Sequence, residues 1–160
     1  MKTSKFLEHI KTRFKNIVVV DTEFQSDISN SYCTKALCAV YKDLETEQIF
    51  KIWDYEQNTL AQHHFDFEET LFVCFYATAE AGYFLKQLMG RPPHIFDCWT
   101  EYAKLYKNSR ELSLLAAATA YAFPNPISKE EKDRFRDMCL KQNTWTKKER
   151  EEILNYCQGD

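Results

Sequence analysis

The sequence is poor in glycine, and this excludes one large group of nucleotide-binding proteins. It has three glycines, Gly82, Gly90 and Gly159, and none of them belongs to a glycine-rich loop. A P-loop or a Rossmann fingerprint needs closely spaced glycines so that the backbone can approach the phosphates. Nucleotide binding through either kind of loop is therefore not expected.

Paired cysteines and long apolar runs are also absent. None of the six cysteines stands in a C-x-x-C pair, and most lie in apolar stretches, as small buried residues do. No signal peptide and no run of about 18 or more apolar residues is visible, so no membrane partner is expected. We expect free thiols and a reducing cytoplasm. His63 and His64 are adjacent, which is poor geometry for a shared metal, and a surface loop is expected there.

An excess of positive charge is the third missing feature. The 21 basic and 24 acidic residues give a formal net charge of −3, unlike a basic architectural protein of nucleic acids. A metal-dependent nuclease has a different balance, because bound cations neutralise part of its acidic cluster. Lys104, Lys107 and Arg110 suit either local phosphate contacts or a solvated helix face, and we favour the helix face. The 160 residues predict one domain, spanning 1–160.

The apolar pattern predicts an α/β fold, in which an antiparallel hairpin is joined to parallel strands in one mixed sheet flanked by helices. Strands are predicted at 16–24, 33–43, 48–53, 71–76 and 95–96. Helices are predicted at 5–13 and 77–89, in two pieces within 98–122, and at 128–140 and 146–156. The last two begin with capping boxes, Ser128 with Glu131 and Thr146 with Glu149.

Two pairs of residues at opposite ends of the chain suggest a catalytic pocket. The apolar run 17–20 leads into Asp21-Thr22-Glu23, and positions two apart on a strand share a face. Tyr156 and Asp160 lie four apart in a helical stretch, so they also share a face. If the fold joins the two ends, the result is an acidic pocket with a tyrosine, which suits hard divalent cations such as Mg²⁺ or Mn²⁺.

Four segments then carry a resemblance to a known family: 20–24, 75–80, 95–97 and 156–160. In this order they resemble the motifs of the 3′–5′ exonuclease domain of the DEDD superfamily, tyrosine subtype, also called DnaQ-like or RNase H-like. Within it, the chain is most similar to the proofreading domain of family A (DNA polymerase I-like) enzymes, particularly phage-type ones. The resemblance spans essentially the whole chain and implies an RNase H-like sheet.

The resemblance also implies a role for each candidate residue. Asp21, Glu23, Glu80 and Asp160 would hold two divalent metal ions, Mg²⁺ or Mn²⁺, with Asp21 bridging both. Tyr156 would position the attacking water. Glu80 stands where the family usually has aspartate, and its side chain is one methylene longer, so the site would have to accommodate a shifted carboxylate.

Two choices stay open at this point. Asp97 competes with Glu80 for the second-motif position, but it is also a plausible helix N-cap, and we favour Glu80 because a strand leads straight into its helix. A second choice concerns the aromatic residues near these motifs, which suit either core packing, the favoured interpretation, or stacking on substrate bases. These aromatic residues are Phe75, Tyr76, Trp99 and Tyr102.

The expected activity is hydrolysis of single-stranded DNA from its 3′ end, of the proofreading type. The alternatives are a weak or inactive nucleic-acid-binding domain that supports a polymerase, and an RNA-trimming exonuclease of the same fold. Because the sequence stops at the proposed ligand Asp160, we expect either a fragment followed by a polymerase module or a domain with a short tail. The resemblance implies a bacterial or phage-infected cell.

Overall fold

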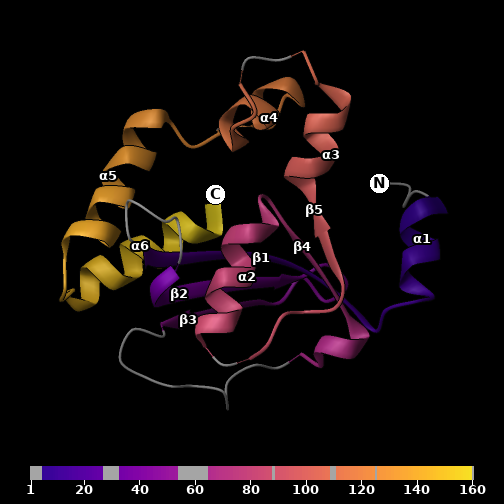
Figure 1. Ribbon diagram of the computed structural model, residues 1–160, viewed down its shortest axis with the longest axis horizontal. Coiled ribbons are helices and arrows are strands. Elements are labelled where there is room, and N and C mark those ends of the chain that lie inside the picture. Colours follow the sequence, from indigo (N-terminus) through magenta and orange to yellow (C-terminus); the bar gives the residue numbers. More distant parts are fainter. Residues whose placement is uncertain are drawn as a thin grey trace.

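A computed structural model describes residues 5–26, 33–53, 65–87, 89–108, 111–124 and 126–159 (Figure 1). The elements follow one another as α1 (Lys5–Lys11), β1 (Asn16–Ser26), β2 (Cys33–Asp43), β3 (Ile49–Trp53), a 3-10 turn η2 (Phe67–Glu69), β4 (Thr70–Cys74), α2 (Ala77–Lys86), β5 (Ile95–Asp97), α3 (Cys98–Leu105), α4 (Leu114–Ala120), α5 (Lys129–Lys141) and α6 (Lys147–Gly159). None of the helices within these ranges is long and apolar enough to cross a membrane.

The five strands form one mixed sheet in the order β3-β2-β1-β4-β5. The pairs β1/β2 and β2/β3 are antiparallel, whereas β1/β4 and β4/β5 are parallel. This confirms the predicted α/β class, with a hairpin joined to parallel strands, and it is consistent with an RNase H-like arrangement.

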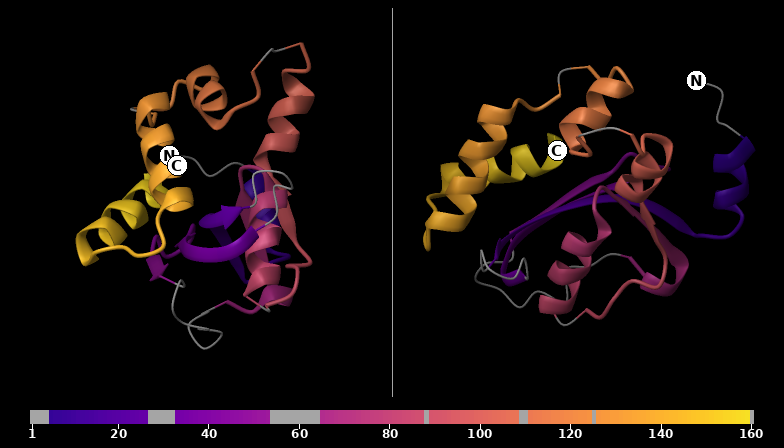
Figure 2. Two further views of the ribbon diagram at one scale, coloured as in Figure 1. Left: turned by 60° about the vertical axis from the view of Figure 1, so that its left-hand side comes forward. Right: turned by 45° about the horizontal axis from the view of Figure 1, so that its top comes forward.

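Helices cover both faces of the sheet. Successive strand residues point to opposite sides, so the strands offer apolar side chains to a core on each face. On β2, Ala39 and Tyr41 belong to a core that includes Phe84 of α2. Cys38 and Val40 belong to a second core with residues of α5 and α6. Both views of Figure 2 show α2 and the α5–α6 pair on opposite sides of the strands.

The parallel neighbours β1 and β4 differ in length, so β1 continues beyond the end of β4. The β1/β4 register runs only to Val19 opposite Val73, whereas β1 continues along β2 as far as Ser26. Asp21 and Glu23 therefore lie where β4 has already ended and the chain turns into α2. They pair with Val40 and Cys38, so their side chains are on the face that α5 and α6 cover.

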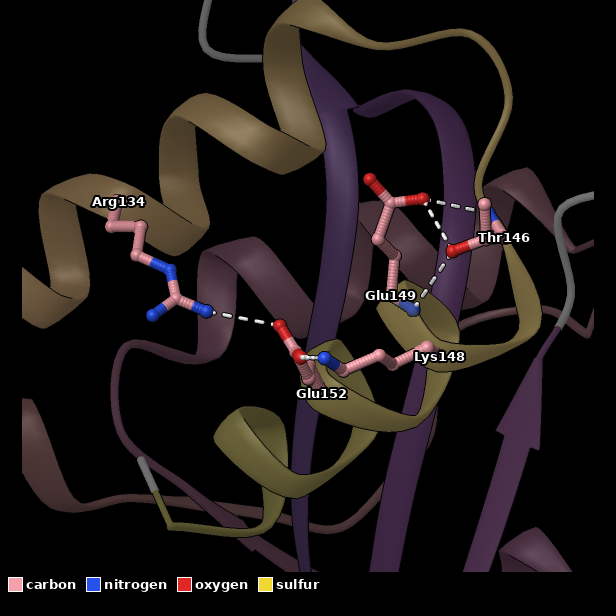
Figure 3. Close-up of polar contacts among 5 residues, drawn as sticks. All are labelled: Arg134, Thr146, Lys148, Glu149 and Glu152. Atoms are coloured by element: carbon pink, nitrogen blue, oxygen red, sulfur yellow. Dashed lines mark hydrogen bonds and ion pairs between the residues drawn. The ribbon is translucent and has the colours of Figure 1, made fainter.

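The last helix is held at its start by the predicted capping box (Figure 3). The Thr146 amide donates to Glu149 Oε2 at 2.7 Å, and the Glu149 amide donates to Thr146 Oγ1 at 3.3 Å. Glu152 of the same helix accepts from Arg134 of α5 at 2.9 Å, and this largely exposed ion pair adds little stability. Burial of Ile153, with no exposed area, does more to fix α6 on the sheet.

Ser128 caps α5 as predicted, because its Oγ accepts from the Glu131 amide at 3.1 Å, which is one of the two bonds of a capping box. Several predicted boundaries were wrong by two or three residues, among them the end of β1, at Ser26 and not at 24, and the end of α6, at Gly159 and not at 156. The strand predicted at 71–76 ends at Cys74, because Tyr76 adopts a left-handed conformation with φ 78° and caps α2. The helix predicted at 77–89 ends at Lys86, and the leading helix ends at Lys11. His63, His64 and Arg110 lie outside the described residues.

Candidate metal and catalytic site

Glu80 is the most unusual carboxylate of the described chain. It lies in the first turn of α2, and its exposed fraction is 3%. Its Oε2 atom is buried without a hydrogen-bond partner among the described residues. Burial raises the pKa of Glu80 well above its usual value, and the negative charges of Asp21, Glu23 and Asp97 raise this pKa further. The sheet end therefore gathers three acids, Asp21, Glu23 and Asp97, around the desolvated carboxyl group of Glu80.

Asp21 and Glu23 are backed by cysteines from the last two helices. The Cys157 thiol of α6 donates to the backbone carbonyl of Asp21 at 3.3 Å. The Cys139 thiol of α5 bonds to the Glu23 side chain, and burial together with the Glu23 charge raises the pKa of this thiol. Sequence reasoning placed these cysteines in apolar stretches but missed their contacts with the acids.

A further missed contact comes from Gln25, at the end of β1. Its Nε2 atom donates to the Cys139 carbonyl at 3.1 Å and to the Gln142 carbonyl at 2.7 Å. Together with the cysteine contacts, these bonds fix α5 and α6 behind the acid-bearing segment of β1. The sequence offered one signal for this, because Gln25 shares the face of Asp21 and Glu23 by its alternation along the strand.

The structure packs the last turn of α6 on β1 at Asp21, so the condition for a pocket between these two segments is met as far as Gly159. Figure 1 shows this turn and the first turn of α2 at the same end of the sheet. Tyr156 is buried, with an exposed fraction of 7%, and stacks on Phe135 with ring centroids 4.6 Å apart and planes at 21°. Its expected role toward a water stays a prediction. Asp160 lies outside the described residues.

Asp97 acts as the N-cap of α3, which confirms that interpretation of the residue. Its Oδ1 atom accepts from the amides of Tyr76, at 3.1 Å, and Trp99, at 3.0 Å. Its Oδ2 atom accepts from Thr100 Oγ1 at 2.9 Å. Both carboxylate oxygens of Asp97 thus accept hydrogen bonds. Glu80 Oε2, by contrast, is buried and has no hydrogen-bond donor among the described residues. Of the two acids, Glu80 is therefore the one with a buried oxygen available to a ligand.

The aromatic residues near the motifs fall into two groups. Tyr102 is buried, with an exposed fraction of 5%, as expected for core packing. Tyr76 is 48% exposed, and its ring meets Trp99 edge to face. Lys104, a candidate for phosphate contact, pairs with Glu101 at 2.6 Å on an exposed helix face.

The chemistry of the acids fits divalent metal ions. Carboxylate oxygens are the ligands that Mg²⁺ and Mn²⁺ prefer, and a buried, unpartnered Oε2 beside other acids has to be neutralised by a proton or by a bound cation. Within the described ranges, no three His, Cys, Asp or Glu side chains are arranged as a complete metal site. The expected ligand set of Asp21, Glu23 and Glu80 also includes Asp160, which those ranges do not contain.

Comparison with models of known protein families and with curated proteins finds no match for this chain.

Proposed function

We propose that this chain is a divalent-metal-dependent 3′–5′ exonuclease that hydrolyses phosphodiester bonds at the 3′ ends of single-stranded DNA. One observation carries the proposal. The buried Glu80 carboxylate, whose Oε2 lacks a described hydrogen-bond partner, faces the charges of Asp21 and Glu23 at the sheet end where α6 packs. Such a cluster of acids is costly for a fold unless it binds cations.

In the proposed reaction, a water oxygen attacks the terminal phosphorus and the bond to the 3′ oxygen breaks. A nucleoside 5′-monophosphate leaves, and the shortened strand keeps a 3′ hydroxyl. Two divalent ions, when bound, stabilise the charge that develops on the attacking and leaving oxygens. Asp21, Glu23, Glu80 and Asp160 would hold these ions, and the Tyr156 hydroxyl would orient the water.

The supporting layer of the site comes from α5 and α6. Cys157, Cys139 and Gln25 keep the acid-bearing part of β1 against these helices. A metal site depends on such outer contacts, since they hold the ligands in position before the ions bind. By the same proposal the domain serves proofreading, with a DNA polymerase module as its partner.

The test is the shortening of a 5′-labelled single-stranded DNA oligonucleotide, with Mn²⁺, with Mg²⁺ and with chelator. We expect a metal-dependent ladder that shortens from the 3′ end and disappears in Asp21→Asn. The matched control is Glu130→Gln, which removes an exposed acid of α5 and should leave the ladder unchanged. Full activity of Asp21→Asn would overturn the proposal.

The same assay separates the two alternatives. A domain that binds DNA ends without cutting them would retain the labelled strand in a binding assay and leave it intact with either metal. An RNA-trimming enzyme would shorten a matched RNA strand faster than the DNA strand when the two compete.

A further inference from the structure

Tyr76 has a backbone conformation that bulky residues rarely adopt. With φ 78° and ψ 67° it is left-handed, and it stands at the junction of β4 and α2. Such a conformation costs free energy for a residue with a Cβ atom, and it persists only where the surroundings impose it. Glycine would take this position without strain, so a tyrosine here requires another explanation.

Asp97 imposes the conformation. Its Oδ1 atom accepts from the Tyr76 amide and from the Trp99 amide, at 3.1 Å and 3.0 Å. Since β4 and β5 are parallel neighbours, the beginnings of α2 and α3 lie side by side, and one carboxylate oxygen ties them together. This shared acceptor fixes Tyr76 and Trp99, and with them their two rings, relative to each other.

The result is an aromatic pair in which Tyr76 is exposed and Trp99 is half-buried. The ring centroids of Tyr76 and Trp99 lie 5.5 Å apart at 84°, and Tyr76 keeps 48% of its surface exposed. An edge-to-face contact leaves the face of one ring open on its far side. Tyr102, by contrast, has its ring inside the protein.

The pair lies beside the acidic cluster. Tyr76 is the N-cap of α2, and Glu80 follows in the first turn of this helix. The charge of Asp97, which bonds both aromatic residues, is among those that raise the pKa of Glu80. The aromatic pair and the acids thus share the carboxyl end of the parallel strands, where ligands bind in open α/β sheets.

From this placement we infer that Tyr76 and Trp99 form a stacking site for an unpaired base of the DNA strand whose 3′ end enters the acidic cluster. The inference rests on the proposed function. Aromatic side chains stack on every base, so such a site accepts any sequence and requires only that the base be unpaired. The chain thereby selects frayed or single-stranded ends over duplex ends.

The test uses tryptophan fluorescence and the anisotropy of labelled DNA in the presence of chelator, so that nothing is cleaved. Trp99 is the tryptophan of the proposed site, whereas Trp53 and Trp145 pack against each other, with centroids 5.5 Å apart, at the core that α5 and α6 cover. A deoxythymidine octamer should quench the fluorescence of the protein, and Trp99→Phe should remove the quenching.

The affinity variants are chosen so that they fold. Tyr76→Gly suits the left-handed backbone and removes the ring, and it should weaken octamer binding by at least about fivefold. Tyr76→Phe keeps the ring and should bind like the parent protein. The matched control is Phe123→Ala, which removes a 65% exposed aromatic ring after α4 and should change nothing.

Three results would overturn the inference: parental affinity in Tyr76→Gly, equal binding of an octamer with abasic 3′ nucleotides, or no octamer binding by the parent protein. Asp21→Asn separates this inference from the proposed function. Quenching that persists in Asp21→Asn while the parent protein shows no cleavage would leave the stacking site in place and refute the exonuclease. Unchanged cleavage and parental affinity in Tyr76→Gly would leave the proposed exonuclease in place and refute the stacking site.

Discussion

The Cys157 thiol and the Asp21 carbonyl, 136 positions apart in the sequence, are joined by a hydrogen bond of 3.3 Å. This bond attaches the last turn of α6 to the strand that carries the first acids. Cys157 follows Tyr156 directly, so the same contact places the end of the tyrosine-bearing helix at the acidic cluster. The fold therefore brings the last described helix, α6, onto the first strand, β1.

Removing the charge of Asp21 should separate metal binding from folding. In the parent protein, Mn²⁺ or Mg²⁺ should raise the melting temperature, because ions that bind only the folded state stabilise it, by about 2.7 kcal/mol at a hundredfold excess over Kd. Asp21→Asn should lose most of this increase. Its metal-free melting temperature should equal or exceed that of the parent, since one repulsion with Glu80 is gone. Thermal unfolding with and without metal measures both effects.

The control for that experiment is Glu130→Gln on the exposed face of α5, which should keep the full metal-dependent increase. An Asp21→Asn protein that is stabilised by metal as strongly as the parent would place the ions elsewhere.

Glu80 should make the metal-free protein less stable as the pH rises. Its pKa in the folded state lies above the usual value of about 4.5, so the folded state binds the proton more tightly than the unfolded state does. The stabilisation is complete below that usual value and is lost as the pH rises through the raised pKa. Glu80→Gln should remove this pH dependence and raise the free energy of unfolding at neutral pH by on the order of 1 kcal/mol.

Denaturant titrations in chelator at several pH values give the measurement. The matched variant is Glu68→Gln in η2, an exposed acid that should leave the pH profile unchanged. A Glu80→Gln profile that follows the parent's would mean that another group causes the pH dependence.

The sequence predicted the sheet well, because hydrophobic periodicity and turn residues act locally. The strand 33–43 was placed at its observed bounds, the capping box of Thr146 and Glu149 formed as predicted, and Ser128 caps its helix. The boundary at Tyr76 was missed, because its left-handed conformation depends on a bond to Asp97 from another strand. Propensity scales carry no information about such a tertiary contact.

The candidate site was predictable in part for the same reason. Asp21 and Glu23 share a face by strand geometry alone, and the structure has them side by side on that face. Glu80 is buried beside them because β4 ends earlier than β1. This difference in strand length is defined only once the sheet is assembled. The thiol contacts of Cys139 and Cys157 likewise required the packed helices.

The capping box of α6 should contribute to stability through Thr146. Thr146→Ala removes the hydroxyl that accepts from the Glu149 amide, and losing an N-cap costs about 1 kcal/mol. For a chain of this size the melting temperature should fall by about 2–4 °C. Lys148→Ala, which breaks only an exposed contact of 3.8 Å with Glu152, should change it far less. Equal losses in the two variants would show that the cap does not limit the stability of α6.

Tyr156 combines two properties that a pair of substitutions can separate. Its ring stacks on Phe135 inside the core, so Tyr156→Ala should lower the free energy of unfolding by about 3–5 kcal/mol. Tyr156→Phe keeps the stacked ring and removes only the hydroxyl, and its stability should change by about 1 kcal/mol or less.

If the hydroxyl orients the attacking water, Tyr156→Phe should reduce cleavage of single-stranded DNA by at least about tenfold while its affinity for the DNA is kept. Single-turnover cleavage and anisotropy measure the two quantities on one protein preparation. A Tyr156→Phe protein with full activity would assign the residue to the core alone. The acids would then have to orient the water without it.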